Sequence, residues 1–251
     1  MGAVRMVAKA LLPRKYHYNA ELFYLFMVDS TTFHERSDRG ELMRKAFRLI
    51  SFNEISGDYL EFGCCGAGTF RQAFSESRKH KLNRQLWAFD SFEGLPPQAV
   101  PADEHPKWLP GQMKTSLDDF HEICRRHGMS RLDYQVVPGY YDQTIGDQNK
   151  DADNLPRDIA FAYIDCDLFS STKTVLEFLS SRLKHGMLIA FDDYYCFSGS
   201  QLSGERRAAL EFLSRNSRFL FSPYLPFGWH GMSFIVEDRR LLKDFNLTVL
   251  P

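Results

Sequence analysis

The sequence predicts an α/β protein with a doubly wound sheet of about seven strands and a helical N-terminal extension. Three observations support this prediction. Short apolar segments alternate with segments of helical periodicity along most of the chain, as expected for parallel strands joined by helices. The apolar segments 159–164 and 187–191 are continuous, which is typical of strands buried on both faces. Glycine or aspartate directly follows several of these segments, at the strand ends where α/β sheets bind ligands.

The expected elements follow one another in a regular order. Apolar residues three or four positions apart between Tyr16 and Glu54 indicate a helical extension, residues 1–56, which we expect to act as a lid over a domain at 57–251. In that domain we expect strands at 58–62, 86–89, 134–137, 159–164, 187–191, 218–222 and 232–236, and helices at 69–80, 116–127, 171–184 and 203–216. Ser116 is the expected N-cap of its helix. The closely joined last two strands predict an antiparallel pair.

Charge and composition restrict the partners of the protein. The 251 residues include 31 basic and 32 acidic ones, which gives a net charge of -1, so no strong field attracts nucleic acid or an anionic membrane. We find no apolar segment long enough to span a bilayer, and the segment 13–15 interrupts the apolar core that a signal peptide would need. The five cysteines lack metal-ligand spacing, which favours reduced thiols over disulfides or a zinc site. We therefore expect a cytoplasmic protein.

A glycine-rich turn follows the first expected strand. The segment 61–69 reads EFGCCGAGT, in which three glycines lead from the strand into a helix. Glycines at such a turn allow a ligand to approach the backbone, and a helix N-terminus directs amide groups toward it. The G-x-x-G-x-G spacing differs from the G-x-G-x-x-G spacing of dinucleotide-binding enzymes. The motif by itself therefore indicates either a ligand-binding turn or an ordinary tight turn.

An acidic residue ends the next expected strand. Asp90, in the segment AFDSFEGLP at 88–96, lies about 20 positions beyond the glycine turn, where a carboxylate can accept hydrogen bonds from ribose hydroxyls. Both NAD and S-adenosylmethionine contain a ribose, so Asp90 does not distinguish between them. Its alternative role is to cap the N-terminus of a helix.

Two pairs of carboxylates follow the two continuous apolar strands. Asp165 and Asp167 come after the first of these strands, and Asp192 and Asp193 come after the second. If the strands are neighbours, four like charges meet at one edge of the sheet, where they would take up protons unless a cation lies among them. Oxygen ligands with open coordination positions suit a hard cation such as Mg²⁺, with Mn²⁺ or Ca²⁺ also possible. The alternative is that the aspartates are acidic caps on separate helices.

Taken together, these segments resemble the macrocin O-methyltransferase (TylF) family. The resemblance covers about Gly57 to Asn216 and rests on the motifs EFG at 61–63, DSFEGLP at 90–96, PGYYDQT at 138–144, DCDLFSST at 165–172 and FDDY at 191–194. It implies a Rossmann-like methyltransferase fold and the magnesium-dependent transfer of a methyl group from S-adenosylmethionine to a hydroxyl. In this family the acceptor is often a sugar of a natural product, so the resemblance implies a small glycosidic acceptor. The resemblance does not determine the oligomeric state, and a homo-oligomer is possible.

The resemblance also implies roles for individual residues. Asp165, Asp192 and Asp193 would hold the metal, and Asp167 would act as general base beside Asp165 in the catalytic centre. Asp90 would bind the ribose of the cofactor, and Glu61 with Gly63 would border its methionine end. The remaining expected cofactor contacts are Gly66, Gly68, Thr69, Ser91, Ser116 and Asp165.

The chain departs from the family pattern at two places, and other functions stay open. Cys64 and Cys65 replace a bulky hydrophobic or aromatic pair, and Asp-Cys-Asp replaces the usual Asp-Gly-Asp, but neither change removes a ligand. His230 is an alternative base or a structural histidine. The alternatives in function are a catalytically inactive methyltransferase-like binding subunit, a methyltransferase for carboxyl or nitrogen acceptors, and an NAD-dependent oxidoreductase. The last would leave the two acidic pairs unexplained.

Overall fold

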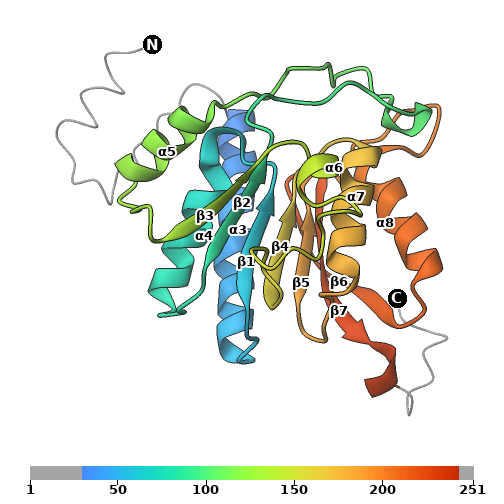
Figure 1. Cartoon of the computed structure of the whole chain (residues 1–251). Coiled ribbons are helices and arrows are strands. Elements are labelled where there is room, and N and C mark those ends of the chain that lie inside the picture. Colours follow the sequence, from blue (N-terminus) through green and yellow to red (C-terminus); the bar gives the residue numbers. More distant parts are fainter. Residues whose placement is uncertain (1–29, 243–251) are drawn as a thin grey trace.

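Seven strands form one mixed sheet in the computed structural model, which describes residues 30–242 (Figure 1). The strands are β1 (Asp58–Phe62), β2 (Leu86–Asp90), β3 (Tyr134–Pro138), β4 (Ile159–Ile164), β5 (Leu188–Phe191), β6 (Phe219–Phe227) and β7 (Gly231–Asp238). The helices are α3 (Ser30–Phe52), α4 (Gly68–Lys79), α5 (Leu117–Arg126), α6 (Tyr141–Thr144), α7 (Phe169–Ser180) and α8 (Gly204–Arg215). Single 3₁₀ turns lie at η2 (Cys65–Ala67), η3 (Pro101–Asp103) and η4 (Arg239–Leu241).

The strand order is β3-β2-β1-β4-β5-β7-β6. The five strands β1 to β5 pair in parallel, whereas β7 runs antiparallel to both β5 and β6. The seven-stranded doubly wound sheet and its terminal antiparallel pair confirm the expectation from the sequence. The chain order reverses between β1 and β4, and the carboxyl ends of the strands at such a switch point form a crevice.

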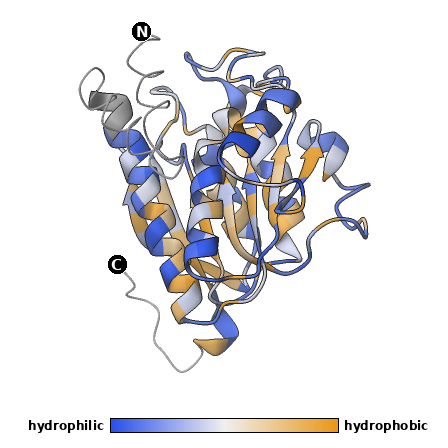
Figure 2. Ribbon diagram, turned by 90° about the vertical axis from the view of Figure 1, so that its left-hand side faces the viewer, coloured by the Kyte–Doolittle hydropathy of each residue, from blue (hydrophilic) through white to orange (hydrophobic). Residues whose placement is uncertain are grey.

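Helices cover both faces of the sheet. On one face α3, α4 and α5 pack against a core that includes the buried strand residues Tyr59, Phe161 and Tyr163. On the other face α7 and α8 pack against Phe62 and Ile164. Successive strand residues point to opposite faces, so the continuous apolar segments supply both cores. Figure 2 shows the hydrophobic strands inside and hydrophilic residues on the outward sides of the helices.

The expected helix boundaries agree with the structure to within a few residues, and Ser116 is the N-cap of α5, since its Oγ accepts a hydrogen bond from the Asp119 amide at 3.2 Å. The short helix α6 was not expected.

The part of the N-terminal extension before residue 30 lies outside the described residues. Within residues 30–242, no helix has the length and apolar character needed to cross a membrane.

One expected strand boundary was wrong. We expected a strand at 218–222 and an irregular connection after it, but β6 continues to Phe227, with an irregular register between Pro223 and Pro226. Proline cannot donate a hydrogen bond to a neighbouring strand and is therefore confined largely to sheet edges. Because β6 is an edge strand, its prolines can be accommodated there.

Candidate active site

The glycine turn after β1 is shaped by its contact with the neighbouring strand end. Gly63 has a φ of +90°, and a Cβ atom at this position would lie 1.9 Å from the carbonyl oxygen of Asp165. Its amide donates to the carbonyl of Phe89 at 2.9 Å. Farther along the turn, the Gly66 amide donates to Thr115 Oγ1 at 2.8 Å. Glycine is therefore required at position 63 because the backbone of the loop after β4 lies so close. The sequence alone did not reveal this reason.

Asp90 ties the glycine turn to the loop after β2. Its Oδ2 accepts a hydrogen bond from the Cys64 amide at 2.6 Å, and its Oδ1 accepts one from the Phe92 amide at 2.7 Å. Each carboxylate oxygen can accept more than one hydrogen bond, so both oxygens retain capacity for a ligand. Burial raises the pKa of Asp90, while the two backbone amides oppose this shift.

Glu61 lies fully buried beneath the turn. Its Oε1 accepts a hydrogen bond from Thr69 Oγ1 at 2.8 Å, and its Oε2 accepts one from the hydroxyl of Tyr59. Removal from water disfavours the ionised form and raises the pKa of Glu61 to about 8, although both hydroxyl groups act in the opposite direction. Glu61 thus holds the first turn of α4 against β1.

The raised pKa of Glu61 predicts how stability depends on pH. Between the unfolded-state pKa of about 4.5 and the folded-state pKa of about 8, the folded protein retains a proton that the unfolded chain has released. The contribution of Glu61 to the free energy of unfolding should therefore fall as pH rises through this interval and change little above it. Urea unfolding at a series of pH values should show a smaller decrease for Glu61→Gln than for the wild type. Equal slopes in the two proteins would contradict this prediction.

Four aspartates meet at the ends of β4 and β5. Oxygen atoms of Asp165, Asp167 and Asp193 lie within 4.8 Å of one another, and Asp193 also belongs to a second such group with Asp192 and His230. Burial together with repulsion from the neighbouring carboxylates raises the pKa values of Asp165, Asp167 and Asp193. The expected convergence of the acidic pairs is therefore seen, because β4 and β5 are adjacent.

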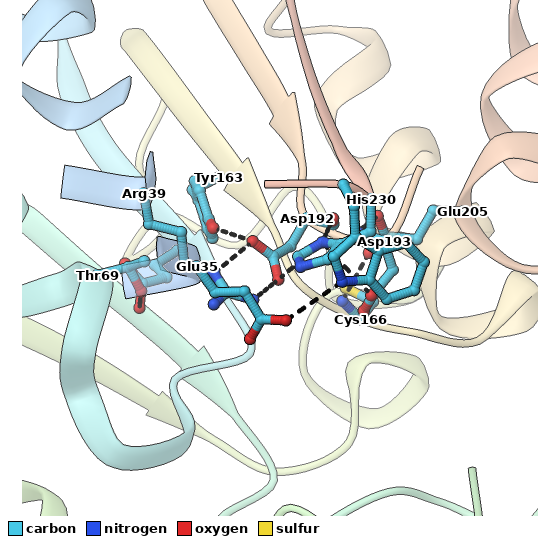
Figure 3. A network of polar contacts seen from close by, with 11 residues as sticks. Glu35, Arg39, Thr69, Tyr163, Cys166, Asp192, Asp193, Glu205 and His230 are labelled. Atoms are coloured by element: carbon cyan, nitrogen blue, oxygen red, sulfur yellow. Dashed lines mark hydrogen bonds and ion pairs between the residues drawn. The ribbon is translucent and has the colours of Figure 1, made fainter. Parts of the chain in front are cut away.

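Asp192 differs from the other three carboxylates because it forms an ion pair. Arg39 of α3 donates from Nε to Oδ1 at 2.8 Å and from Nη2 to Oδ2 at 2.5 Å, and the Tyr163 hydroxyl also donates to Oδ1 (Figure 3). Burial by itself raises the pKa of Asp192, but the Arg39 guanidinium, together with His230 and the Tyr163 hydroxyl, lowers it below its ordinary value. The helical extension thereby contacts the acidic site directly.

His230 also contacts the loop after β5. The buried imidazole donates from Nδ1 to the carbonyl oxygen of Asp192 at 2.5 Å, since a carbonyl can only accept. The preceding Trp229 donates from Nε1 to Glu35 Oε1 at 3.2 Å. The contact with the Asp192 carbonyl joins His230 to the loop that carries the second acidic pair.

A cavity of about 400 Å³ opens at the carboxyl ends of β1, β2 and β4, which is within the size range of small-molecule sites. Its lining includes five of the expected site residues: Gly63, Asp90, Ser91, Asp165 and Asp167. Leu95, Met113 and the segment 139–143 line it as well. The other expected cofactor contacts do not contribute to the lining: Glu61, Gly66, Gly68, Thr69 and Ser116.

Sequence reasoning missed three side chains that organise this region: Arg39, Asp103 and Glu205. Asp103 is buried in the loop at 93–111, accepts hydrogen bonds from the Ala99 and Val100 amides at 2.9 and 3.1 Å, and accepts a third from the Ser170 amide at 2.7 Å. It therefore attaches this loop to the N-terminus of α7. Nothing in the local spacing distinguishes these three residues from ordinary surface charges.

The cysteines are free thiols, as the sequence predicted. Cys64, Cys124 and Cys166 are buried, whereas Cys65 is exposed and lies on the cavity lining. Of the two cysteines that depart from the family pattern at the turn, only Cys65 thus faces the cavity.

Strand order, the switch point between β1 and β4, and the cavity beside it define a Rossmann-like methyltransferase fold. The solved structure of the O-methyltransferase NovP has a TM-score of 0.67 at 20% identity and covers 79% of each chain. CalS11, a calicheamicin methyltransferase, has a TM-score of 0.63 at 20% identity, covering 90% of this chain and 86% of that one. The profile of the macrocin O-methyltransferase (TylF) family matches residues 35–215, and the chain belongs to this family.

One curated relative comes from Streptomyces olivaceus. It is 8-demethyl-8-(2,3-dimethoxy-alpha-L-rhamnosyl)-tetracenomycin-C 4'-O-methyltransferase, which is 28% identical to this chain over 148 residues. The match covers 56% of this chain and 54% of the relative, so it spans about half the length of that protein.

Proposed function

We propose that this protein is an O-methyltransferase that transfers the methyl group of S-adenosylmethionine to a hydroxyl group of a small glycosidic natural product. The main support for the proposal is that the expected cofactor site and the expected reaction site share one cavity. A single cavity is lined by Gly63 and Asp90, where the cofactor is expected, and by Asp165 and Asp167, where the reaction is expected. Donor and acceptor can therefore meet within one site.

The residues on the lining fit S-adenosylmethionine. Asp90 retains acceptor capacity on both carboxylate oxygens for the ribose hydroxyls. Gly63 and Ser91 line the cavity as well. We propose that Glu61 and Thr69 support the turn from below, that Gly66 and Gly68 shape the turn itself, and that Ser116 supports it by starting α5.

The donor set also fits a divalent cation. Carboxylate oxygen atoms of Asp165, Asp167 and Asp193 lie close to one another, and oxygen is the donor atom that Mg²⁺ and Mn²⁺ prefer. The pKa values of the three carboxyl groups are raised, in part by their mutual repulsion, which a bound cation would relieve. We propose Asp165 and Asp193 as ligands together with Asp192, whose Oδ2 accepts a single hydrogen bond from Arg39 and keeps capacity for a ligand. A cation bound here would neutralise the carboxylates and polarise the acceptor hydroxyl.

Asp167 is the proposed general base. Its carboxylate lies on the cavity lining next to Asp165 and can accept the proton that the acceptor hydroxyl loses. The backbone of Asp167 has a φ of +59°, a sparsely populated conformation that is often found at functional sites. The side chains lining the cavity would hold the acceptor oxygen in line with the methyl group, and positioning of this kind contributes roughly 7–11 kcal/mol in well-oriented reactions.

The class of acceptor is inferred from the curated relative, whose name places its methyl group on a rhamnosyl oxygen. We propose that two loops select the acceptor: the loop at 93–111, part of which lines the cavity, and the loop at 195–203. We also propose that the protein is cytoplasmic, because its sequence lacks the apolar segments expected of a signal peptide or a membrane span.

Calorimetric titration of S-adenosylmethionine tests the proposal, with NAD as the comparison ligand. Saturable binding of S-adenosylmethionine without binding of NAD would support it, and a screen of rhamnosides and other glycosides for methylation would follow. Absence of S-adenosylmethionine binding would contradict it and would favour an inactive homologue that acts as a binding subunit.

Removal of metal should abolish most of the turnover. Once an acceptor is found, treatment with a chelator should reduce the rate by about 100-fold or more, because a Lewis acid contributes several kcal/mol and each 1.36 kcal/mol corresponds to a factor of ten. Restoring Mg²⁺ or Mn²⁺ should restore the rate, whereas S-adenosylmethionine affinity should change little. Full turnover in the chelated protein would exclude a catalytic metal.

A further inference from the structure

Glu205 connects the two loops that carry the acidic pairs. It lies in the first turn of α8, and its side chain is fully buried. Its Oε1 accepts a hydrogen bond from the Cys166 amide at 2.9 Å, and its Oε2 accepts one from the Asp193 amide, also at 2.9 Å (Figure 3). One carboxylate therefore binds the backbone of the loop after β4 and the backbone of the loop after β5.

The two amides that Glu205 binds belong to the acidic loops themselves. Cys166 lies between Asp165 and Asp167, and Asp193 is itself one of the acidic side chains. If either amide moved away from Glu205, the distance from the Asp165 and Asp167 carboxylates to the Asp193 carboxylate would change. A glutamate is suited to this role, because each of its two oxygens accepts a hydrogen bond from an N–H group, whereas a glutamine has a single oxygen.

The surroundings of Glu205 are acidic, so its two contacts form beside other carboxyl groups. Glu205 is buried close to Asp167 and Asp193, and like charges disfavour one another in such surroundings. A neutral group would satisfy one of the amides without this repulsion. The two-point contact therefore makes the spacing of the two acidic loops depend on this one side chain.

We propose that Glu205 is a positioning residue that sets the spacing between Asp165 and Asp193 and thereby determines the affinity of the site for a divalent cation. This inference rests on the proposed metal dependence. The proposed role resembles that of residues that orient metal ligands from outside the coordination sphere, whose loss typically weakens metal affinity or activity by about 10- to 100-fold.

Binding of Mn²⁺ to the full-length protein, measured by electron paramagnetic resonance, tests the proposal. In Glu205→Gln the dissociation constant for Mn²⁺ should rise by about 10- to 100-fold, while the affinity for S-adenosylmethionine stays close to that of the wild type. Glu211→Gln is the matched control on the same helix, since Glu211 forms ion pairs at the surface with Arg207 and Arg215. The control should bind Mn²⁺ like the wild type.

Kinetics separate positioning from general damage to the fold. In Glu205→Gln the metal concentration for half-maximal turnover should rise, and saturating Mg²⁺ should restore kcat toward the wild-type value. A low kcat that saturating metal does not restore would overturn the proposal. If Glu205→Gln fails to fold, Glu205→Asp decides the question. Aspartate keeps a carboxyl group, but its shorter side chain should not reach both amides, so this variant should bind Mn²⁺ more weakly.

The possible failures are distinguishable. If the wild type binds no Mn²⁺, the proposed metal dependence fails and this inference fails with it. If the wild type binds Mn²⁺ and the folded Glu205 variants bind it equally well, the positioning role is excluded while the proposed function stands.

Discussion

Asp167→Asn should lower kcat by about 100- to 10,000-fold, the range expected when a general base is lost. The amide that replaces the carboxylate cannot take the proton from the acceptor hydroxyl. Asparagine tolerates the left-handed backbone conformation, so the φ of +59° at this position can be retained. Formation of S-adenosylhomocysteine at saturating Mg²⁺ measures kcat, and calorimetry should show an almost unchanged affinity for S-adenosylmethionine.

Two further variants make this experiment specific. Asp118→Asn changes an exposed carboxylate in the first turn of α5, and its activity should equal that of the wild type. His230→Gln tests the alternative base. Near-normal turnover in Asp167→Asn combined with a large loss in His230→Gln would move the base to His230, in spite of the hydrogen bond from its Nδ1 to the Asp192 carbonyl.

Gly63→Ala should destabilise the protein by about 2–6 kcal/mol. Strain from a side chain at positive φ contributes about 1–3 kcal/mol, and steric overlap contributes about 1–3 kcal/mol more. The overlap is severe because the new Cβ would lie 1.9 Å from the Asp165 carbonyl oxygen. This loss is a large part of the roughly 5–15 kcal/mol that stabilises a typical domain. Urea unfolding followed by circular dichroism measures the difference.

Gly68→Ala is the matched control from the same turn. Gly68 has a φ of −65° at the start of α4, and a Cβ there would meet open space. Alanine is favoured over glycine in a helix by about 0.5–1 kcal/mol, so this variant should be at least as stable as the wild type. Equal stability of the two variants would show that the β1 turn adapts to the added methyl group.

The order of elements and most of their positions could be predicted because they depend on local patterns. Continuous apolar segments identify β4 and β5, and the aspartates that follow them were expected to converge if these strands pair. The pairing of Ile164 with Phe191 brings the two strand ends together. The extension of β6 through its prolines was missed, since only its place at the sheet edge makes such a strand acceptable.

The residues around the acidic pairs could not be predicted in the same way. Arg39 contacts Asp192 across 153 positions of sequence, and Glu205 contacts Cys166 across 39. Neither contact has a local signal, because each depends on how a helix packs against the sheet. Glu61 illustrates the same limit: the motif identified it as important, but only the structure shows that it lies beneath the turn.

The sequence by itself determined the α/β class, the glycine turn, the acidic residues at three strand ends and the resemblance to the family. These features are encoded within short segments, where periodicity and residue type are sufficient. Tertiary structure alone decided that Gly63 is required by Asp165, that Arg39 neutralises Asp192, and that Glu205 joins the two acidic loops. Such contacts form between segments distant in the chain, and their existence depends on the packing of the whole fold.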